Sequence, residues 1–473
     1  MVRLAICSDA EADSQRMPNE GSGPSRKGQL SNLLRGARLS VLRTNPAKLL
    51  VVGYVGYMLA GWCLLSMPLT HETRVAAIDS FFTSVSAVST TGLATIDPGT
   101  SYNLLGELII LLLIQIGGVG YMTIGSFAVL ATAHKLSPLR EKITRAAFAL
   151  PDDLKPGHFI LTVVIFTLVC EAIGAFVLWL IFRAAGEENA VWSAIFHAVS
   201  AFCTAGFSLN PNSFEAYSGN AALNIVISAL SLLGAMGFLV IWDVWRNFTS
   251  AAFHLGFTTK VILRMTGSFL FIGTLILFVA DPGISALEPS DRLLAAFFQT
   301  MTATTTVGFN TVPIGGLSMS VLVVLFVLMA VGASPSGTGG GLKTTTFAAL
   351  LAIMRSTLKQ RSRVRFFKRP IAASRLQAAG ASAVYFIVLM SIAIFLLGLT
   401  DPQFEFERIV FEVISALGTV GLSMGITGEL SDLGKLIIII LMTAGRVGIL
   451  TFGIAIAMHD ESRSEEKDNE LLI

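Results

Sequence analysis

Residues 82–93 read FTSVSAVSTTGL, and the pattern returns as FHAVSAFCTAGF at 196–207, FQTMTATTTVGF at 298–309 and FEVISALGTVGL at 411–422. Counted from the glycine, every copy has Phe ten residues earlier, Ser or Thr six earlier, Ala five earlier and Thr two earlier, and Leu or Phe follows it. Repetition at a regular interval is the signature of a repeated structural unit. One copy would be typical of an ordinary helix–turn boundary, whereas four matching copies indicate one element arranged four times around an axis.

The composition indicates a membrane protein. Of the 473 residues, 53% are hydrophobic and 14% are charged, and the mean hydropathy of +0.72 is far above the soluble norm. No acid–base pair, Ser–His set or metal-like Cys or His spacing occurs in the apolar segments, so the sequence predicts neither an enzyme nor a covalent cofactor. Eight apolar stretches are long enough to span a bilayer, at roughly 47–67, 103–131, 158–183, 221–242, 262–280, 319–354, 379–399 and 433–458.

Basic residues predict the orientation in the membrane. The segment 355–375 contains eight Lys or Arg residues and no acid, and 132–157 is also basic. Cytoplasmic loops carry such an excess, so both termini are predicted to be cytoplasmic. The polar tail 1–45 has no apolar signal core and is predicted to be disordered. By default 355–375 is a positive-inside loop beside the membrane; the alternative is a docking surface for a cytoplasmic subunit.

The stretch before each turn predicts a re-entrant element. It has about a dozen residues, for example 77–89, and is too short to cross a core of ~30 Å. Non-helical backbone at membrane depth persists only where protein or a water-filled cavity lines it. The predicted fold is therefore an all-α membrane protein with eight transmembrane helices in four membrane–pore–membrane repeats, with pseudo-fourfold symmetry around a central pore. The repeats are 46–131, 158–243, 262–354 and 379–458, and the cytoplasmic segments are 1–45, 132–157, 244–261, 355–378 and the acidic tail 459–473.

The turns have the chemistry of a filter for a monovalent cation. The C-terminal end of each re-entrant helix carries a partial negative charge, and the glycine lets the chain turn without a Cβ. Rings of carbonyl groups can then replace the hydration shell of the ion. No acidic ring lies within the turns, which argues against a divalent cation. The candidate filter residues are Thr90, Thr91, Gly92, Thr204, Ala205, Gly206, Thr306, Val307, Gly308, Thr419, Val420 and Gly421.

The sixth apolar stretch is interrupted at 332–344 by five glycines and one proline. About 13 apolar residues precede the break, roughly 20 Å of helix, so it lies near mid-membrane, where a broken helix points to the transport path. A nucleotide-binding loop is excluded because Leu342 stands where glycine must precede the lysine. The candidate gating residues are Ser336, Gly337, Thr338, Gly339, Gly340, Gly341 and Lys343; for Lys343, a structural helix cap is the alternative.

Arg446 is the strong charge inside the last apolar stretch. An arginine at the bilayer centre costs at least ~2.5–3.5 kcal/mol, so Arg446 is predicted to face protein or a cavity rather than lipid. The alternative is a side chain that reaches the inner interface. Nine residues before the four glycines stand Thr83, His197, Gln299 and Glu412; because they differ among the repeats, they are interpreted as packing or bracing residues rather than ligands.

The four turns and the broken sixth span resemble the Trk/Ktr/HKT superfamily of K⁺ transporters from about residue 46 to 458. The eight-span pattern is most similar to the membrane subunit (KtrB) of Ktr systems. The resemblance implies K⁺ at the filter residues, gating by the glycine-rich loop and a pore-lining Arg446. It also implies a homodimer, stimulation by Na⁺, and a cytoplasmic KtrA-like ring that binds ATP or ADP, with no nucleic-acid partner. A Trk-type K⁺/H⁺ symporter or a Na⁺-permeable relative remains the alternative.

Overall fold

The computed structural model describes residues 46–133, 156–249, 255–335, 337–361, 363–366 and 369–456. The predicted tails 1–45 and 459–473, most of the predicted loop 132–157, part of the loop 244–261, and Ser336 lie outside the described residues. The description below concerns the unit that begins at Pro46.

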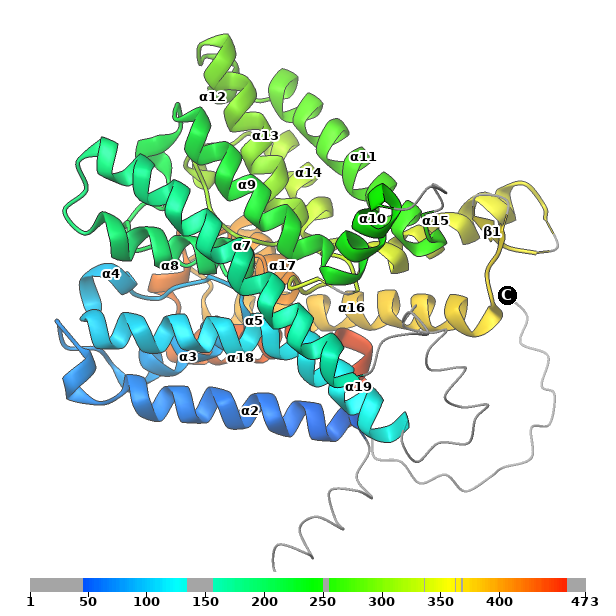
Figure 1. The fold of residues 1–473 in the computed structure, drawn as a ribbon, viewed down its shortest axis with the longest axis horizontal. Coiled ribbons are helices and arrows are strands. Elements are labelled where there is room, and N and C mark those ends of the chain that lie inside the picture. Colours follow the sequence, from blue (N-terminus) through cyan, green and yellow to red (C-terminus); the bar gives the residue numbers. More distant parts are fainter. Residues whose placement is uncertain are drawn as a thin grey trace, which may run out of the picture. The chain divides into compact units, whose positions relative to one another are not determined.

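The described chain is almost entirely helical (Figure 1). Repeat 1 contains α2 (Pro46–Leu65), η1 (Pro68–Thr70), α3 (Ala77–Ser89), α4 (Pro98–Ser101) and α5 (Leu104–Ala133). Repeat 2 contains α7 (Pro156–Ala185), α8 (Ala190–Phe202), η2 (Glu215–Tyr217), α9 (Ala221–Met236) and α10 (Phe238–Thr249). Repeat 3 contains α11 (Phe257–Ala280), α12 (Pro282–Ser285), α13 (Pro289–Thr305), η3 (Ile314–Gly316), α14 (Met319–Ala330) and α15 (Thr344–Leu358).

A two-stranded antiparallel hairpin, β1 (Arg365–Phe366) and β2 (Arg369–Pro370), follows α15 and pairs Arg365 with Pro370. Repeat 4 contains α16 (Ala373–Thr400), α17 (Phe406–Gly418), η4 (Thr427–Glu429), α18 (Asp432–Val447) and α19 (Ile449–Ile456). The short helices α3, α8, α13 and α17, which we call the turn helices, each end at one of the four sequence turns.

Three helices of the described chain are long and apolar enough to cross a membrane: Leu161–Ala185, Phe257–Ala280 and Ala373–Thr400. The pair formed by α9 and α10, bent by 99°, is a fourth if it counts as one span. Shorter apolar helices cover Val51–Leu65, Leu104–Gly120, Ala190–Phe202 and Met319–Ala330. The protein is thus a helical membrane protein.

The second long helix is broken in three of the four repeats. The predicted break in repeat 3 separates α14 from α15 at residues 331–343. From the sequence, 221–242 and 433–458 are expected to be continuous, but the structure divides them at Gly237 and Gly448. Their φ angles, 78° and 94°, fall in the left-handed region that glycine adopts without a steric penalty, so a helix cannot pass through them.

The repeats pack in cyclic order. The second long helix of each repeat contacts the turn helix of the next: α5 contacts α8, α9 contacts α13, α14 contacts α17, and α18 contacts α3. The phenylalanine ten residues before each glycine lies in the interior of this arrangement; Phe82, Phe196, Phe298 and Phe411 are each 0% exposed. The last contact, between α18 and α3, joins the fourth repeat to the first, and these two repeats are not consecutive in the sequence.

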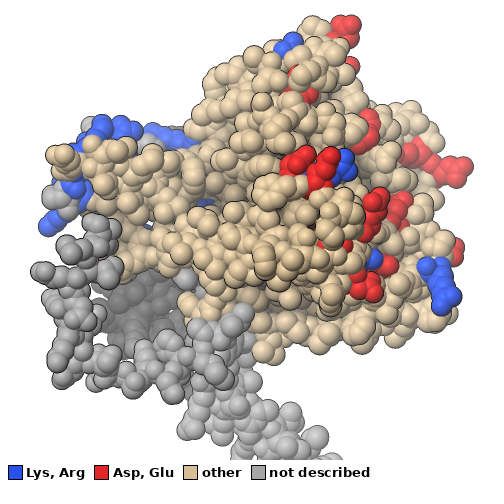
Figure 2. All heavy atoms as spheres, turned by 180° about the vertical axis from the view of Figure 1, so that it is seen from behind, with Lys and Arg blue, Asp and Glu red and all other residues tan. Residues whose placement is uncertain are grey.

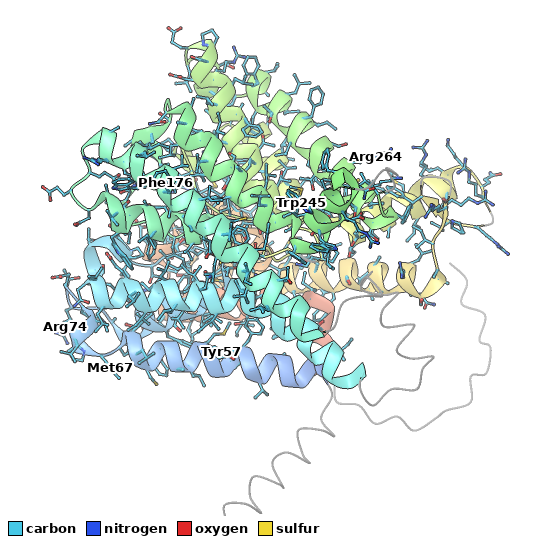
Figure 3. The ribbon with its side chains drawn as sticks, viewed as in Figure 1. Tyr57, Met67, Arg74, Phe176, Trp245 and Arg264 are labelled. Carbon is cyan, nitrogen blue, oxygen red and sulfur yellow. The ribbon has the colours of Figure 1, made fainter. Side chains whose placement is uncertain are left out.

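Charge is separated between the two ends of the protein. On the face in Figure 2, lysine and arginine gather at the end that carries the β hairpin, and acidic residues gather at the opposite end. In Figure 3 the labelled Arg264 lies towards the end with the β hairpin, and the labelled Arg74 lies at the opposite end. Between them the surface is apolar; Phe176, for example, is 59% exposed. An apolar band between two charged ends is what a bilayer requires.

Candidate ion pathway

The four turns share one backbone geometry. The residue two before each glycine is a threonine in the left-handed region: Thr90, Thr204, Thr306 and Thr419 have φ of 50°, 51°, 58° and 50°. The next residue donates its N–H to the carbonyl five positions earlier, as in Thr91 N to Ser86 O at 2.9 Å and Val420 N to Ser415 O at 2.8 Å. This is a Schellman helix end. A β-branched residue is strained there, by about 1–3 kcal/mol, so the turn persists only where its surroundings impose it.

The glycines pack against one another in a closed cycle. All four have positive φ, between 67° and 92°. A Cβ at Gly92 would collide with the carbonyl oxygen of Ala205, one at Gly206 with Val307, one at Gly308 with Val420, and one at Gly421 with Thr91. Each added Cβ would also lie 3.0–3.2 Å from the Cα of the next glycine. The predicted filter residues of all four repeats therefore meet at one place, and their backbones approach closely enough to require glycine.

The Ser or Thr six residues before the glycine supports the turn through a hydrogen bond. Gly92 N donates to Ser86 Oγ at 3.1 Å, Gly308 N to Thr302 Oγ1 at 3.0 Å and Gly421 N to Ser415 Oγ at 3.1 Å. In repeat 2, Ser200 Oγ instead donates to the Phe207 carbonyl at 2.8 Å. The repeated hydroxyl thus stabilises the chain at the glycine and has a structural role.

Three of the four threonine hydroxyls, those of Thr204, Thr306 and Thr419, lie against the loop between α14 and α15. Those of Thr90, Thr306 and Thr419 are buried and have no hydrogen-bond partner among the described residues. Thr204 Oγ1 lies 3.0 Å from Thr338 Oγ1. A Cβ at Gly339 would collide with the Thr306 hydroxyl, and one at Gly340 with the Thr419 hydroxyl.

The segment 331–343, which we call the glycine loop, therefore lies directly against the turns. Its described residues other than Pro335 and the half-buried Leu342 and Lys343 are buried. Thr338 N donates to the Gly234 carbonyl at 3.0 Å, and Lys343 Nζ donates to the Gly339 carbonyl at 2.6 Å. Lys343 is also the N-cap residue of α15, although its side chain makes no capping hydrogen bond. Ser336 lies outside the described residues.

Arg446 joins this loop to the first repeat. Its side chain is 2% exposed, and its two terminal nitrogens donate to the carbonyls of Thr338 and Gly117. Its side chain is thus enclosed by protein. The guanidinium of Arg446, on α18 of the fourth repeat, therefore connects the glycine loop to α5 of the first repeat.

Glycines in the second long helices were missed by the sequence analysis. A Cβ at Gly117, Gly234 or Gly445 would collide with the carbonyl oxygen of Val88, Phe202 or Leu417 respectively. Each of these carbonyls lies four residues before a turn glycine. The helices can therefore approach the ends of the turn helices only because a side chain is missing. Glycines inside apolar helices were the available signal in the sequence.

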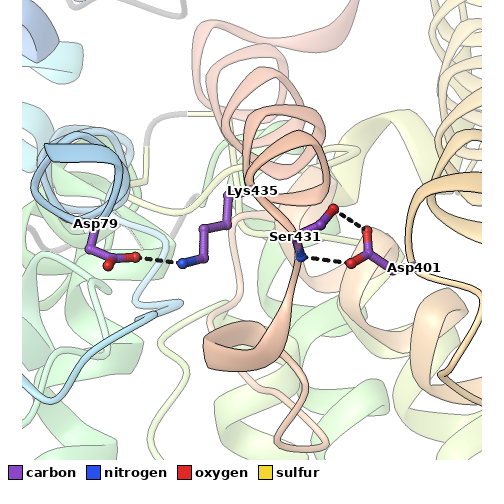
Figure 4. Close-up of polar contacts among 4 residues, drawn as sticks. All are labelled: Asp79, Asp401, Ser431 and Lys435. Atoms are coloured by element: carbon purple, nitrogen blue, oxygen red, sulfur yellow. Dashed lines mark hydrogen bonds and ion pairs between the residues drawn. The ribbon is translucent and has the colours of Figure 1, made fainter. Parts of the chain in front are cut away.

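The contact between repeats 4 and 1 has an ion pair (Figure 4). Lys435 Nζ lies 2.7 Å from Asp79 Oδ1, and the two side chains are 10% and 13% exposed. On the other side of α18, Asp401 accepts from Ser431 N at 2.6 Å and from Ser431 Oγ at 3.0 Å. The start of α18 is therefore held between α3 and the end of α16.

The segments outside the spans also contain perturbed groups. Burial raises the pKa of Asp97, and hydrogen bonds from Thr100 and Gly99 oppose that shift in part. Burial and the neighbouring Glu187 carboxylate raise the pKa of Tyr217. Among the described residues no group of His, Cys, Asp and Glu is suited to hold a metal ion.

A helical membrane protein in which four turns meet over a broken helix belongs to the class of multi-pass membrane transporters. The chain is a member of the TrkH cation transport family, because the model of that family, "TrkH: Cation transport protein", matches residues 57–467. This confirms the resemblance on which the sequence analysis relied.

Curated relatives agree over most of their length. The chain is 33% identical to "Ktr system potassium uptake protein B" of Vibrio alginolyticus, over 87% of this chain and 91% of the relative. It is 34% identical to the protein of the same name from Bacillus subtilis, over 91% and 97%. It is 35% identical to "Potassium/sodium uptake protein NtpJ" of Enterococcus hirae, over 86% and 92%. These relatives are transporters, as the absence of enzyme motifs predicted.

The fold is similar to that of a solved structure, the potassium transporter TrkH from Vibrio parahaemolyticus, with a TM-score of 0.65. The two chains are 20% identical, and the match covers 86% of this chain and 83% of that one.

Proposed function

We propose that this protein mediates K⁺ uptake through a central, channel-like pore whose selectivity filter is formed by the four Thr-x-Gly turns. The closed cycle of contacts from Gly92 to Gly206, Gly308, Gly421 and back to Thr91 carries this proposal. It supports coordination of a dehydrated monovalent cation, because such coordination needs backbone carbonyls of all four repeats close together. The ligands are carbonyls of Thr90–Gly92, Thr204–Gly206, Thr306–Gly308 and Thr419–Gly421.

The same proposal assigns the architecture. The eight apolar stretches form four membrane–pore–membrane repeats with pseudo-fourfold symmetry, and the turn helices are the pore helices. The cyclic packing of second helices on turn helices supports this assignment. The basic end of the protein faces the cytoplasm, together with both termini, in the cell membrane.

The glycine loop is the gate of this pore. Its contacts with the hydroxyls of Thr204, Thr306 and Thr419 support a barrier directly below the filter. Arg446 holds the barrier in place through the Thr338 carbonyl, and Lys343 stabilises it through the Gly339 carbonyl.

Regulation follows from the Ktr-type relatives. We expect a homodimer, Na⁺ stimulation, and a KtrA-like cytoplasmic ring with bound ATP or ADP, docked on the inner loops. The proposal of a regulatory ring would be wrong if the purified protein alone had full flux that does not respond to nucleotide, and if no ring protein co-purified from native membranes.

A Na⁺-permeable transporter is the second candidate, because one relative bears the name of a potassium/sodium uptake protein. A Trk-type K⁺/H⁺ symporter is a third. Initial rates of K⁺ and Na⁺ entry into proteoliposomes, at several external pH values, separate the three.

The filter is tested by Gly308→Ser. The added Cβ collides with the Val420 carbonyl, and φ of 88° is unfavourable for serine. We expect the ratio of K⁺ to Na⁺ entry to fall. Gly316→Ser, at a glycine with open space around the Cβ position, is the matched control. Wild-type selectivity in a stably inserted Gly308→Ser protein would refute the filter.

A further inference from the structure

The residue nine positions before each glycine lies behind the turn and is buried. His197, Gln299 and Glu412 are 0% exposed, and Thr83 is 1% exposed. Each belongs to a turn helix, so its side chain can reach the chain that leaves the turn. We call the residues one to six positions after each glycine the post-glycine segment.

In repeat 2, His197 binds the post-glycine segment with one ring nitrogen. Nε2 lies 3.0 Å from Ser208 Oγ and accepts from Leu209 N at 3.3 Å. Nδ1 lies 2.8 Å from the Ser193 carbonyl oxygen, which can only accept, so the proton is on Nδ1. The imidazole thus connects its own helix to the chain beyond the turn.

In repeat 3, Gln299 makes the corresponding connection. With its amide oxygen turned towards the post-glycine segment, it accepts from Thr311 N at 2.9 Å and Val312 N at 3.1 Å. In repeat 4, Glu412 accepts from Ser423 Oγ at 2.8 Å and from Thr427 Oγ1. Three chemically different side chains at one repeat position therefore have the same role: each accepts hydrogen bonds from the post-glycine segment of its own repeat.

Repeat 1 differs. The Thr83 hydroxyl is buried and makes no hydrogen bond with its post-glycine segment, 93–98, among the described residues. Two positions after Gly92 stands Ala94, where repeats 2 and 4 have the hydroxyls of Ser208 and Ser423. The Thr95 hydroxyl, three positions after Gly92, is also buried without a partner among the described residues.

We propose that His197, Gln299 and Glu412 are positioning residues for selectivity. They fix the post-glycine segments that directly follow three of the filter turns, and the segment after the turn of repeat 1 is left as the adjustable one. A smaller cation such as Na⁺ is coordinated well only if carbonyls move inwards. Hydrogen bonds from a buried helix oppose that movement in repeats 2, 3 and 4. The inference rests on the proposed filter and adds which residues limit its deformation.

The test uses Gln299→Met and Glu412→Met, which preserve side-chain length and remove the hydrogen bonds. They are compared with Thr83→Val, which changes the same position in repeat 1, where no such hydrogen bond is present. Gln377→Met, on the exposed surface of α16, controls for the substitution itself. Purified full-length proteins are reconstituted, and the ratio of initial Na⁺ to K⁺ entry is measured with each cation alone.

Loss of both hydrogen bonds should raise the Na⁺/K⁺ ratio by about fivefold or more in both methionine variants. Thr83→Val and Gln377→Met should keep the wild-type ratio. Glu412→Gln should stay near it, because the amide oxygen can accept from one of the two hydroxyls and the amide NH₂ can donate to the other. A wild-type ratio in the methionine variants overturns the inference, as does an equal rise in Thr83→Val.

If the methionine variants fail to insert, the double variant Ser208→Ala/Ser423→Ala provides the test. It removes the serine hydroxyls that bond to His197 and Glu412, and each change is small. A rise of about threefold or more supports the inference, and an unchanged ratio overturns it. Gly308→Ser is measured in parallel. If it changes the ratio while the buried-residue variants do not, only this inference fails; if it also leaves the ratio unchanged, the filter itself is wrong.

Discussion

Arg446→Gln should release the glycine loop. The guanidinium is almost fully buried and donates to the Thr338 carbonyl, on the loop, and to the Gly117 carbonyl, on α5. Glutamine is shorter and uncharged, so it loses both contacts. A hydrogen bond from a charged donor contributes about 1.5–3 kcal/mol.

The contact with Thr338 exists only while the loop lies against the turns. Its loss should therefore favour the displaced loop by about 1.5–3 kcal/mol, a factor of roughly 10–150 in the equilibrium between the two positions. K⁺ flux at saturating K⁺ should rise within that range, as measured by rubidium-86 uptake into proteoliposomes. The half-saturating K⁺ concentration should change much less, because the guanidinium of Arg446 holds the glycine loop and α5.

Two further variants separate tethering from simple charge repulsion. Arg446→Lys keeps the charge but cannot reach both carbonyls with a planar fork, so it should also raise the flux. If only the positive charge mattered, Arg446→Lys would behave as wild type. Arg408→Gln, at an arginine with a 41% exposed side chain, should have no effect. Wild-type or lower flux in a correctly inserted Arg446→Gln protein would refute the reasoning.

Two predictions concern packing. Lys435→Met leaves Asp79 without its partner and should cost about 3–5 kcal/mol of stability, whereas Lys435→Met with Asp79→Asn should cost less; thermal melting of the purified proteins in detergent checks this, and a single variant as stable as the double one would contradict it. Gly332→Ala places a Cβ against the Gly340 carbonyl and should abolish regulated transport, whereas Gly380→Ala meets nothing within 4 Å and should be neutral or slightly stabilising; equal K⁺ flux in both would show that the loop does not need its close backbone contact.

Local patterns allowed much of the site to be predicted. The Thr-x-Gly turns, the ends of the turn helices and the break after Ala330 follow from short-range backbone preferences, which glycine and proline dominate. Arg446 could be placed against protein because lipid excludes an unpaired charge. The sequence did not reveal the breaks at Gly237 and Gly448, since a single glycine inside an apolar helix is often tolerated.

By itself, the sequence determined the membrane class, the fourfold repetition and the residues of the turns, because these depend on composition and on neighbours along the chain. Only the tertiary structure decided which residues meet across repeats. Gly421 abuts Thr91, Lys435 pairs with Asp79, and Arg446 reaches Gly117, each across more than 300 residues. Such contacts are set by the packing of the whole chain, and no local pattern encodes them.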